Sequence, residues 1–130
     1  MAVRIRRAYA DPAREDGTRV LVDRVWPRGR SREALQLAGW ERDVAPSDEL
    51  RHWFGHDPAR WAEFRRRYRA ELEAPDRRAA LDRLARLAQA GTLTLVYGAA
   101  DEEHNQAVVL REVLEARGQG RPRGVSGGSR

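Results

Sequence analysis

The chain has 130 residues, of which 41% are hydrophobic and 35% charged, which suits one globular domain and excludes a chain that is disordered throughout. It contains no cysteine, which excludes disulfides, a thiol nucleophile and thiolate metal sites. All 25 basic residues are arginine, yet residues 1–116 carry 21 of them against 20 acids, so the body lacks the strong positive charge of a dedicated nucleic-acid binder.

Nothing in the sequence predicts contact with a membrane. No apolar run approaches the roughly 18 residues that span a bilayer. The first ten residues lack the apolar segment of a signal peptide. We therefore expect a bacterial, cytoplasmic protein without a membrane partner.

The N-terminal part of the chain predicts two strands. Residues 3–9 begin with alternating aliphatic and arginine side chains, as a half-buried or edge strand does. Residues 18–24 begin as a continuous aliphatic run, which is typical of a strand covered on both faces. Residues 30–38 indicate a short helix, and residues 39–44 a short strand or irregular structure.

The middle of the chain is predicted to be helical. Ser47 is placed to cap a short helix that ends at Gly55. A second helix restarts at Asp57 and Pro58 and continues to Leu72, with an apolar residue at every third or fourth position. This period assigns the aromatic side chains of the region to the core rather than to a stacking surface: Trp53, Phe54, Trp61, Phe64 and Tyr68.

The C-terminal part predicts a helix, a strand and a helix. Residues 76–90 have helical periodicity, and residues 92–100, TLTLVYGAA, contain the clearest strand of the chain. The last helix is expected to begin at Asp101 as its N-cap. Residues 117–130 contain glycine, proline, serine and arginine and are expected to be a disordered tail after a domain over residues 1–116.

Strands separated by helices predict an α/β fold, a small single domain with a largely parallel sheet of three or four strands flanked by helices. Ligands of such sheets bind beyond the carboxyl ends of the strands. Two predicted strands are followed directly by polar side chains, one from Asp23 onward and one from near Tyr97 onward. If these strands are parallel and close, their polar side chains meet at one edge of the sheet.

The first polar cluster contains Asp23, Arg24, Trp26 and Arg28. A guanidinium group matches a phosphate or carboxylate, and an indole offers a face for packing. We interpret Arg24, Trp26 and Arg28 as ligand-binding residues and Asp23 as a catalytic candidate. In the alternative, Trp26 fills a gap under the loop and Arg24 pairs with one of three acids: Asp23, Asp43 or Asp101.

The second polar cluster begins where the last predicted strand runs through Val96 into Tyr97. His104 is a candidate general acid or base, with Asp101 or Asn105 orienting its ring at an N-terminal helix end that favours anions. Tyr97 and Asn105 are candidate ligand contacts. In the alternative, Asp101 is only a cap and His104 is a solvated residue, since the junction lacks the repeated glycines of a phosphate-binding fingerprint.

Two other patterns give little evidence for a metal site or a serine nucleophile. His52 and His56 are spaced like a zinc-binding pair, but Gly55 separates them and no third ligand follows at the expected spacing, so we predict no metal site and no cofactor. No serine has the G-x-S-x-G context of a nucleophile.

Three unusual segments occur in order along the chain: "VDRVWPRG", "APSDELRHWFGHDPARWAEFRRRY" and "TLTLVYGAADEEHNQAVVL". With them the chain resembles the YeaO-like family, a branch of the bacterial superfamily called domain of unknown function 488. The resemblance covers roughly residues 3–115. It implies a small cytosolic α/β domain and no established reaction.

Other branches of that superfamily are similar at the same two strand ends. One of their patterns, a strand ending in Asp-Val-Arg followed by Pro–Ser–Arg, resembles four residues here: Asp23, Arg24, Pro27 and Arg28. Their Cys-His-Arg cluster after the last strand corresponds to the region of His104 and Asn105. Because this chain has no cysteine, the resemblance carries over no thiol chemistry.

These patterns predict that the protein binds a small anion, such as a nucleotide or another phosphate ester, and leave open whether it is an enzyme. Arg24 and Arg28 would hold the anion, and Trp26 or Tyr97 would pack on its organic part. His104 together with Asp101 would handle protons, so both are catalytic candidates. The alternative is a non-enzymatic module for a protein or nucleic acid, with nucleic-acid contact weak and through the tail; a homodimer is also left open.

Overall fold

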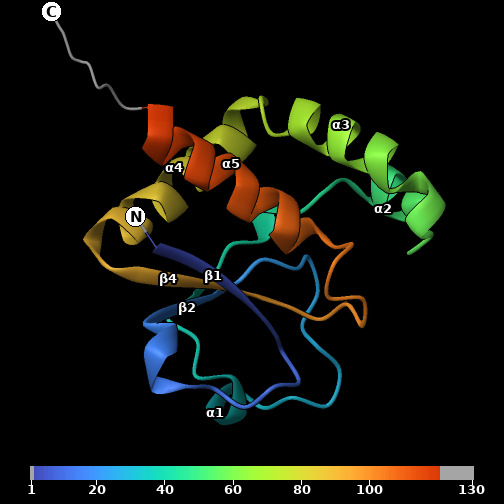
Figure 1. The fold of residues 1–130 in the computed structure, drawn as a ribbon. Coiled ribbons are helices and arrows are strands. Elements are labelled where there is room, and N and C mark those ends of the chain that lie inside the picture. Colours follow the sequence, from blue (N-terminus) through green and yellow to red (C-terminus); the bar gives the residue numbers. More distant parts are fainter. Residues whose placement is uncertain (1, 121–130) are drawn as a thin grey trace, which may run out of the picture.

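Within residues 2–120, which the computed structural model describes, four parallel strands form one sheet in the order β1-β4-β2-β3 (Figure 1). The strands are β1 (Ala2–Arg7), β2 (Thr18–Leu21), β3 (Gly39–Trp40) and β4 (Thr92–Tyr97). The helices are α1 (Arg32–Leu35), α2 (Asp48–Phe54), α3 (Trp61–Glu71), α4 (Pro75–Ala90) and α5 (Gln106–Gly120). The predicted α/β fold with a largely parallel sheet of three or four strands is confirmed.

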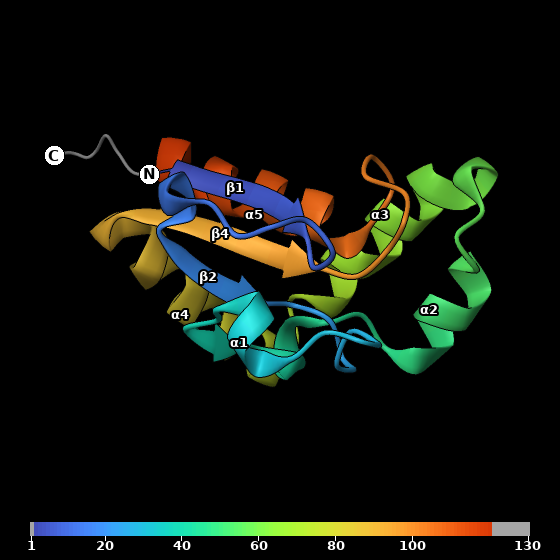
Figure 2. The same ribbon diagram turned by 90° about the horizontal axis from the view of Figure 1, so that it is seen from below.

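The sheet has a thick helical layer on one face and a thin layer on the other. The helices α3, α4 and α5 lie over one face, and α1 lies below the other (Figures 1 and 2). Alternate residues of β4 serve the two faces, because successive side chains of a strand point in opposite directions. Leu95 belongs to the large core under the helices, and Val96 to the small core beside α1.

The strand β2 is buried from both sides, as its aliphatic run predicts. Val20 and Val22 pack into the large core, whereas Leu21 packs into the small one. All three side chains are almost completely buried. No helix within residues 2–120 is long and apolar enough to cross a membrane.

The predicted helix ends differ in accuracy. At α2 the prediction is confirmed, since the Ser47 hydroxyl accepts the N–H of Leu50 and Gly55 takes the left-handed conformation with φ 53°. Asp57 caps a short 3₁₀ turn, and α3 begins only at Trp61.

Asp101 was expected to cap the last helix, and this prediction was wrong. The Asp101 carboxylate accepts the N–H groups of Glu103 and His104, which closes a turn in the loop before the helix. α5 begins at Gln106, and the Asn105 side chain accepts the N–H of Val108 in the capping position. The predicted tail boundary falls inside α5, and residues 121–130 lie outside the described residues.

A buried ion pair joins Asp16 to Arg19 at the start of β2, at the opposite end of the strand from the polar clusters. The Asp16 side chain is 0% exposed, and the Arg19 guanidinium donates to its Oδ2 at 2.7 Å. Burial raises the pKa of the Asp16 carboxyl, but the Ala13 N–H and the Arg19 guanidinium oppose it, so that the pKa lies below its usual value. This pair was not predicted from the sequence.

The buried Tyr68 hydroxyl ties α3 to the 3₁₀ turn Arg42–Val44, because it donates to the carbonyl oxygen of Val44. We expect Tyr68→Phe to lower the free energy of unfolding by about 1–2 kcal/mol, since it leaves a buried acceptor without a partner. Urea denaturation measures the loss. Tyr9→Phe removes an exposed hydroxyl and serves as the control; equal stability of the Tyr68→Phe and wild-type proteins would contradict the prediction.

Candidate functional site

The structure brings the two polar strand ends together. β2 pairs directly with β4, with Leu21 opposite Val96, so both strands end at the same edge of the sheet. The Gly98 N–H donates to Asp23 Oδ2 at 2.8 Å, and the Gln106 amide donates to Asp23 Oδ1. A Cβ atom at residue 98 would lie 2.9 Å from Asp23 Oδ2, so a glycine at this position allows the close approach.

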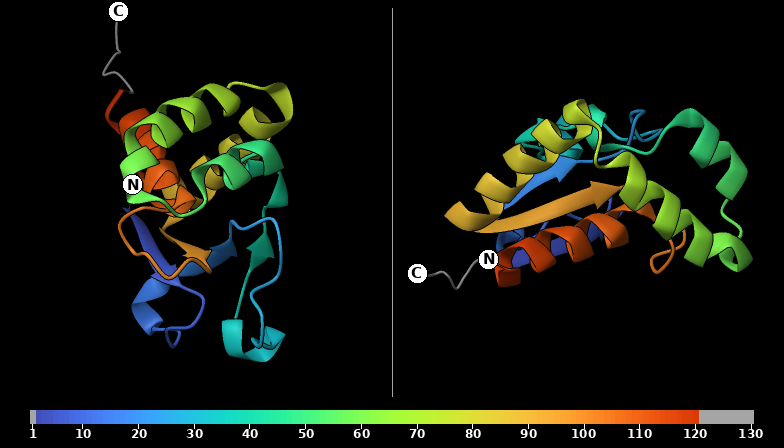
Figure 3. Two further views of the ribbon diagram at one scale, coloured as in Figure 1. Left: turned by 90° about the vertical axis from the view of Figure 1, so that its right-hand side faces the viewer. Right: turned by 90° about the horizontal axis from the view of Figure 1, so that it is seen from above.

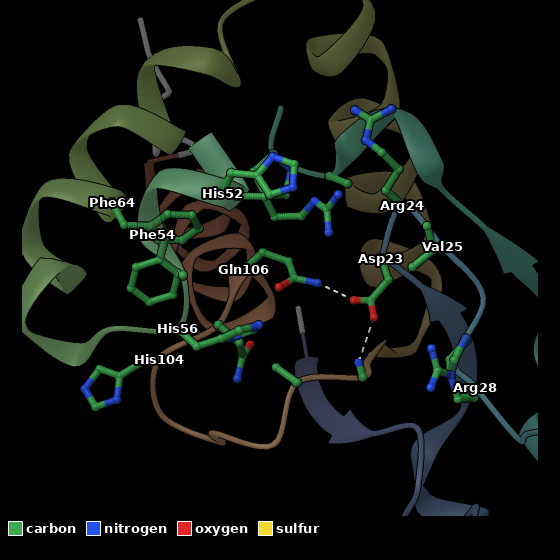
Figure 4. A pocket seen from close by; sticks show the side chains of 18 of the residues that line it. Asp23, Arg24, Val25, Arg28, His52, Phe54, His56, Phe64, His104 and Gln106 are labelled. Carbon is green, nitrogen blue, oxygen red and sulfur yellow. Dashed lines mark hydrogen bonds between the residues drawn. The ribbon is translucent and has the colours of Figure 1, made fainter. Parts of the chain in front are cut away.

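A pocket of about 500 Å³ opens at this edge (Figure 4). Its walls come from the loop after β2, from α2 and the turn that follows it, and from the loop that leads into α5. Figure 3 shows α2 and α3 reaching out beyond the strand ends on the helical side of the sheet. Six of the eight predicted site residues line the pocket: Asp23, Arg24, Trp26, Arg28, His104 and Asn105.

The other two predicted residues do not line it. Tyr97 is 1% exposed and belongs to the large core, where burial raises the pKa of its hydroxyl. It borders a separate hollow beside β1. Asp101 lies behind His104, and its Oδ2 is 2.9 Å from His104 Nδ1. The N–H of Glu103 and the His104 ring lower the pKa of the Asp101 carboxyl.

Four polar residues of the pocket were missed from the sequence: Arg51, His52, His56 and Gln106. The spacing of the two histidines in the sequence indicates only a possible metal pair. Because α2 ends at Gly55 and His56 takes a left-handed conformation with φ 57°, both rings border the same pocket. Among the described residues, no group of three or more histidine, cysteine, aspartate or glutamate side chains is arranged to hold a metal ion.

Basic groups dominate the lining of the pocket. Three arginines and all three histidines of the chain face a single carboxylate, that of Asp23. Arg24 Nε and Arg51 Nη2 lie 3.5 Å and 3.1 Å from the same oxygen of Asp48, which lies outside the lining. The predicted alternative, in which Arg24 pairs with Asp23, Asp43 or Asp101, was therefore wrong about the partner.

Arg28 and Trp26 differ in their surroundings. Arg28 is exposed, and within residues 2–120 no carboxylate lies within ion-pair distance of its guanidinium. Trp26 donates its indole N–H to the Arg30 carbonyl and meets Trp40 edge-on, with ring centroids 5.4 Å apart. Trp26 thus fills space under the loop, as the alternative interpretation predicts, and also borders the pocket.

Asp23 is the titratable group that the site perturbs most visibly. Burial raises the pKa of its carboxyl to about 6. The Gly98 N–H and the Gln106 amide lower it, as do the charges of Arg51 and His56, but they do not cancel the cost of burial. Near neutral pH the group therefore changes its charge inside the pocket.

His104 lies at the border of the pocket and is held from two sides. The Asp101 carboxylate contacts its Nδ1, and the Trp61 ring meets the imidazole edge-on at 5.2 Å between centroids. These contacts leave Nε2 as the ring nitrogen without a contact to Asp101. The arrangement can orient an imidazole for a hydrogen bond to a ligand.

Comparison with known proteins adds relatives without a known activity. A family model described as the inactive DUF488-N3 subclade, DUF488-N3i, matches residues 2–126. The uncharacterised protein Rv3073c of Mycobacterium tuberculosis is 41% identical over 115 residues, which cover 88% of this chain and 95% of that protein. The uncharacterised protein YeaO of Escherichia coli is 38% identical over 116 residues, or 89% of this chain and 99% of that protein. No solved structure matches.

Proposed function

Because the chain belongs to the YeaO-like DUF488 family, in the subclade whose model is described as inactive, we propose that it is a binding domain for a small anion rather than an enzyme. The ligand is a phosphate ester or nucleotide, and its phosphate lies in the pocket at the carboxyl ends of β2 and β4. One observation carries the proposal: the pocket is lined by three guanidinium groups and three imidazoles against one carboxylate.

The charges around the pocket support an anion. Arginine stays protonated at any physiological pH and can bind two oxygens of a phosphate or carboxylate at once. Arg24 and Arg51 share one exposed acid, Asp48, and Arg28 is free of ion pairs among the described residues. α5 begins at Gln106 on the pocket wall, so the positive end of its dipole adds to the same field.

The apolar part of the lining supports a ligand with an organic body. Trp26 is half-buried and borders the pocket, whereas the Phe54 and Phe64 rings, stacked at 4.4 Å between centroids, are 5% and 2% exposed and close the pocket from the core side. Val25, which also lines the pocket, is 59% exposed. Flat or apolar groups pack on such surfaces. A nucleotide or an aromatic phosphate ester therefore suits the pocket better than an inorganic ion alone.

The proposal gives binding roles to residues that the sequence suggested as catalytic. The absence of cysteine removes the thiol of the similar Cys-His-Arg cluster, and Asp101 lies outside the lining. His104, oriented by Asp101, donates to the ligand, and Asp23 contacts it from the floor of the pocket. We place this binding in the bacterial cytoplasm, which is compatible with a chain that holds no disulfide.

A thermal-shift panel of nucleotides, sugar phosphates and simple carboxylates tests the proposal. A ligand at 100 times its Kd should add about 2.7 kcal/mol of apparent stability to the wild-type protein. We expect Arg24→Ala and Arg28→Ala each to raise the Kd by about tenfold or more, as each removes a charge-assisted contact. Arg86→Ala, on the exposed face of α4, is the matched control and should leave the Kd unchanged.

Two results would reject the proposed function. In the first, no phosphate-bearing compound of the panel stabilises the wild-type protein at millimolar concentration. In the second, a compound binds but Arg24→Ala, Arg28→Ala and Arg86→Ala bind it equally well, which would place the ligand elsewhere on the surface.

A further inference from the structure

A carboxylate at the floor of an arginine-rich pocket is unexpected for an anion site. Figure 4 shows the Asp23 side chain pointing into the middle of the pocket, toward Gln106. It is the single acid of the lining. In such a position a negative charge repels the ligand and also pays the cost of burial.

A purely structural role does not account for this carboxylate. Asp23 joins the end of β4 to the start of α5 by accepting the Gly98 N–H and the Gln106 amide. An asparagine could accept the Gly98 N–H equally well, and the Gln106 amide could turn its oxygen toward the asparagine NH₂ group. That arrangement would avoid the burial of a charge.

The hydrogen bonds of Asp23 leave part of its acceptor capacity unused. Each carboxylate oxygen has two acceptor positions, and each accepts one hydrogen bond from the protein. A donor on the ligand can therefore reach the carboxylate without displacing Gly98 or Gln106. A ligand oxygen without a hydrogen would instead face a lone pair of an Asp23 carboxylate oxygen, and the two would repel each other.

We propose that Asp23 determines specificity, by selecting tetrahedral oxyanions that carry a hydrogen, such as hydrogen phosphate, over those that carry none, such as sulfate. The inference rests on the proposed function and names the form of the phosphate group that the pocket accepts, which is one that keeps a P–O–H. Inorganic phosphate has this hydrogen at pH 8, and a phosphate monoester has it only as the monoanion that forms below its second pKa of about 6. The ligand P–O–H donates to Asp23, while its other oxygens accept from the arginines. Sulfate gains the arginine contacts but leaves Asp23 without a donor and opposed to an oxygen, which is how a buried polar group rejects a close analogue.

The other charged groups around Asp23 affect both anions alike. They are Arg24 and Arg28 from the loop after β2, Arg51 and His52 from α2, His56 from the turn after α2, His104 from the loop before α5, and Asp48, which pairs with two of these arginines. At one pH their attraction for two dianions of the same shape nearly cancels in the ratio of the two Kd values. That ratio therefore reports on Asp23.

The ionisation of Asp23 gives the selectivity a pH dependence. The raised pKa of about 6 means that the carboxyl is ionised at pH 8 and protonated at pH 5. In the protonated form the Asp23 carboxyl can donate a hydrogen bond to a sulfate oxygen, so it no longer opposes sulfate binding. The preference for phosphate over sulfate is therefore expected at pH 8, where both are dianions. It is reduced at pH 5, where Asp23 can donate to sulfate and phosphate is the singly charged H₂PO₄⁻.

Isothermal titration of the full chain with inorganic phosphate and with sulfate, at pH 8 and low ionic strength, tests the inference. Both anions are doubly charged at this pH, and only phosphate carries a hydrogen. We expect the wild-type protein to bind phosphate about tenfold to a hundredfold more tightly, the effect of one hydrogen bond to a charged group. Asp23→Asn should reduce this ratio to about threefold or less, because its amide can donate to sulfate. Arg28→Ala should weaken the binding of both anions and preserve the ratio of their Kd values.

The outcomes separate this inference from the proposed function. If the wild-type protein binds phosphate and sulfate equally, or if Asp23→Asn keeps the preference, Asp23 does not select the ligand, although the pocket still binds anions. If the wild-type protein binds neither anion while its fold is intact by circular dichroism, both the anion pocket and the role of Asp23 are rejected.

Discussion

Asp23→Asn is expected to make the fold more stable at pH 8, by about 2–3 kcal/mol, and to change its stability little at pH 4. The ordinary carboxyl pKa of 3.8 rises to about 6 in the folded protein. Between these values the native state binds more protons than the unfolded state, so the stability of the wild-type protein falls as the pH rises from about 4 to 6. Above pH 6 the cost is complete, and at 1.36 kcal/mol per pKa unit it amounts to about 3 kcal/mol. The asparagine side chain carries no such cost.

Guanidinium chloride denaturation at pH 4, 6 and 8 measures this difference. Asp48→Asn is the matched control, because Asp48 is exposed and the Arg51 hydrogen bond lowers the pKa of its carboxyl. It should give no gain at pH 8. An Asp23→Asn protein that is less stable than wild type at pH 8 would refute the expectation. A gain combined with lost anion selectivity would show that stability is given up for binding at this site.

The second large effect is expected at Asp16, where Asp16→Ala should lower the free energy of unfolding by about 3–5 kcal/mol. The substitution leaves the Arg19 guanidinium, 4% exposed, without its carboxylate, and an unpaired buried charge is costly. It also removes the acceptor of the Ala13 N–H. Because the pKa of the Asp16 carboxyl is lowered in the fold, its contribution is present at neutral pH and is lost below about pH 4, as the folded group takes up its proton.

Two further variants identify the cause of this loss. Replacing Asp16 with leucine and Arg19 with methionine together removes both charges and should restore much of the stability. Glu63→Ala breaks exposed ion pairs with Arg66 and Arg67 and should cost far less. Urea melts at pH 7 compare the three. An Asp16→Ala protein as stable as Glu63→Ala would show that the buried pair contributes little.

The sequence predicts the strands well because their signals are local. The aliphatic run through Val22 and the alternation in residues 92–97 each indicate a strand without reference to the rest of the chain. The strand order is not local. Parallel strands pair through residues far apart in sequence, so nothing near β2 indicates that β4 rather than β1 lies beside it.

Three predicted site residues illustrate what local sequence patterns can and cannot predict. Tyr97 follows Leu93 and Leu95 at two-residue steps, so the alternation of β4 already indicates that its ring enters the large core rather than the pocket. The choice between Asp101 and Asn105 as the cap of α5 has no such signal. Both residue types cap helices, and the path of the loop back over the sheet decides between them.

The missed pocket residues depend on tertiary structure. Arg51 and His52 belong to a helix whose own sequence indicates only a cap and an apolar face. They reach the pocket because α2 lies beyond the strand ends (Figure 3). The rule that ligands bind beyond the carboxyl ends of parallel strands identifies the parts of the site around Asp23 and His104. It cannot identify the helix that covers them.

The central place of β4 also orders the steps by which the chain can fold. β1 and β2 each pair with β4, and Ala2 lies opposite Thr92, so the first strand meets its partner only after some ninety further residues have been synthesised. Until then, β1 and β2 have no common neighbour, and folding depends on long loop closures, which slow it. The pocket at the ends of β2 and β4 is consequently among the last features that a growing chain can assemble.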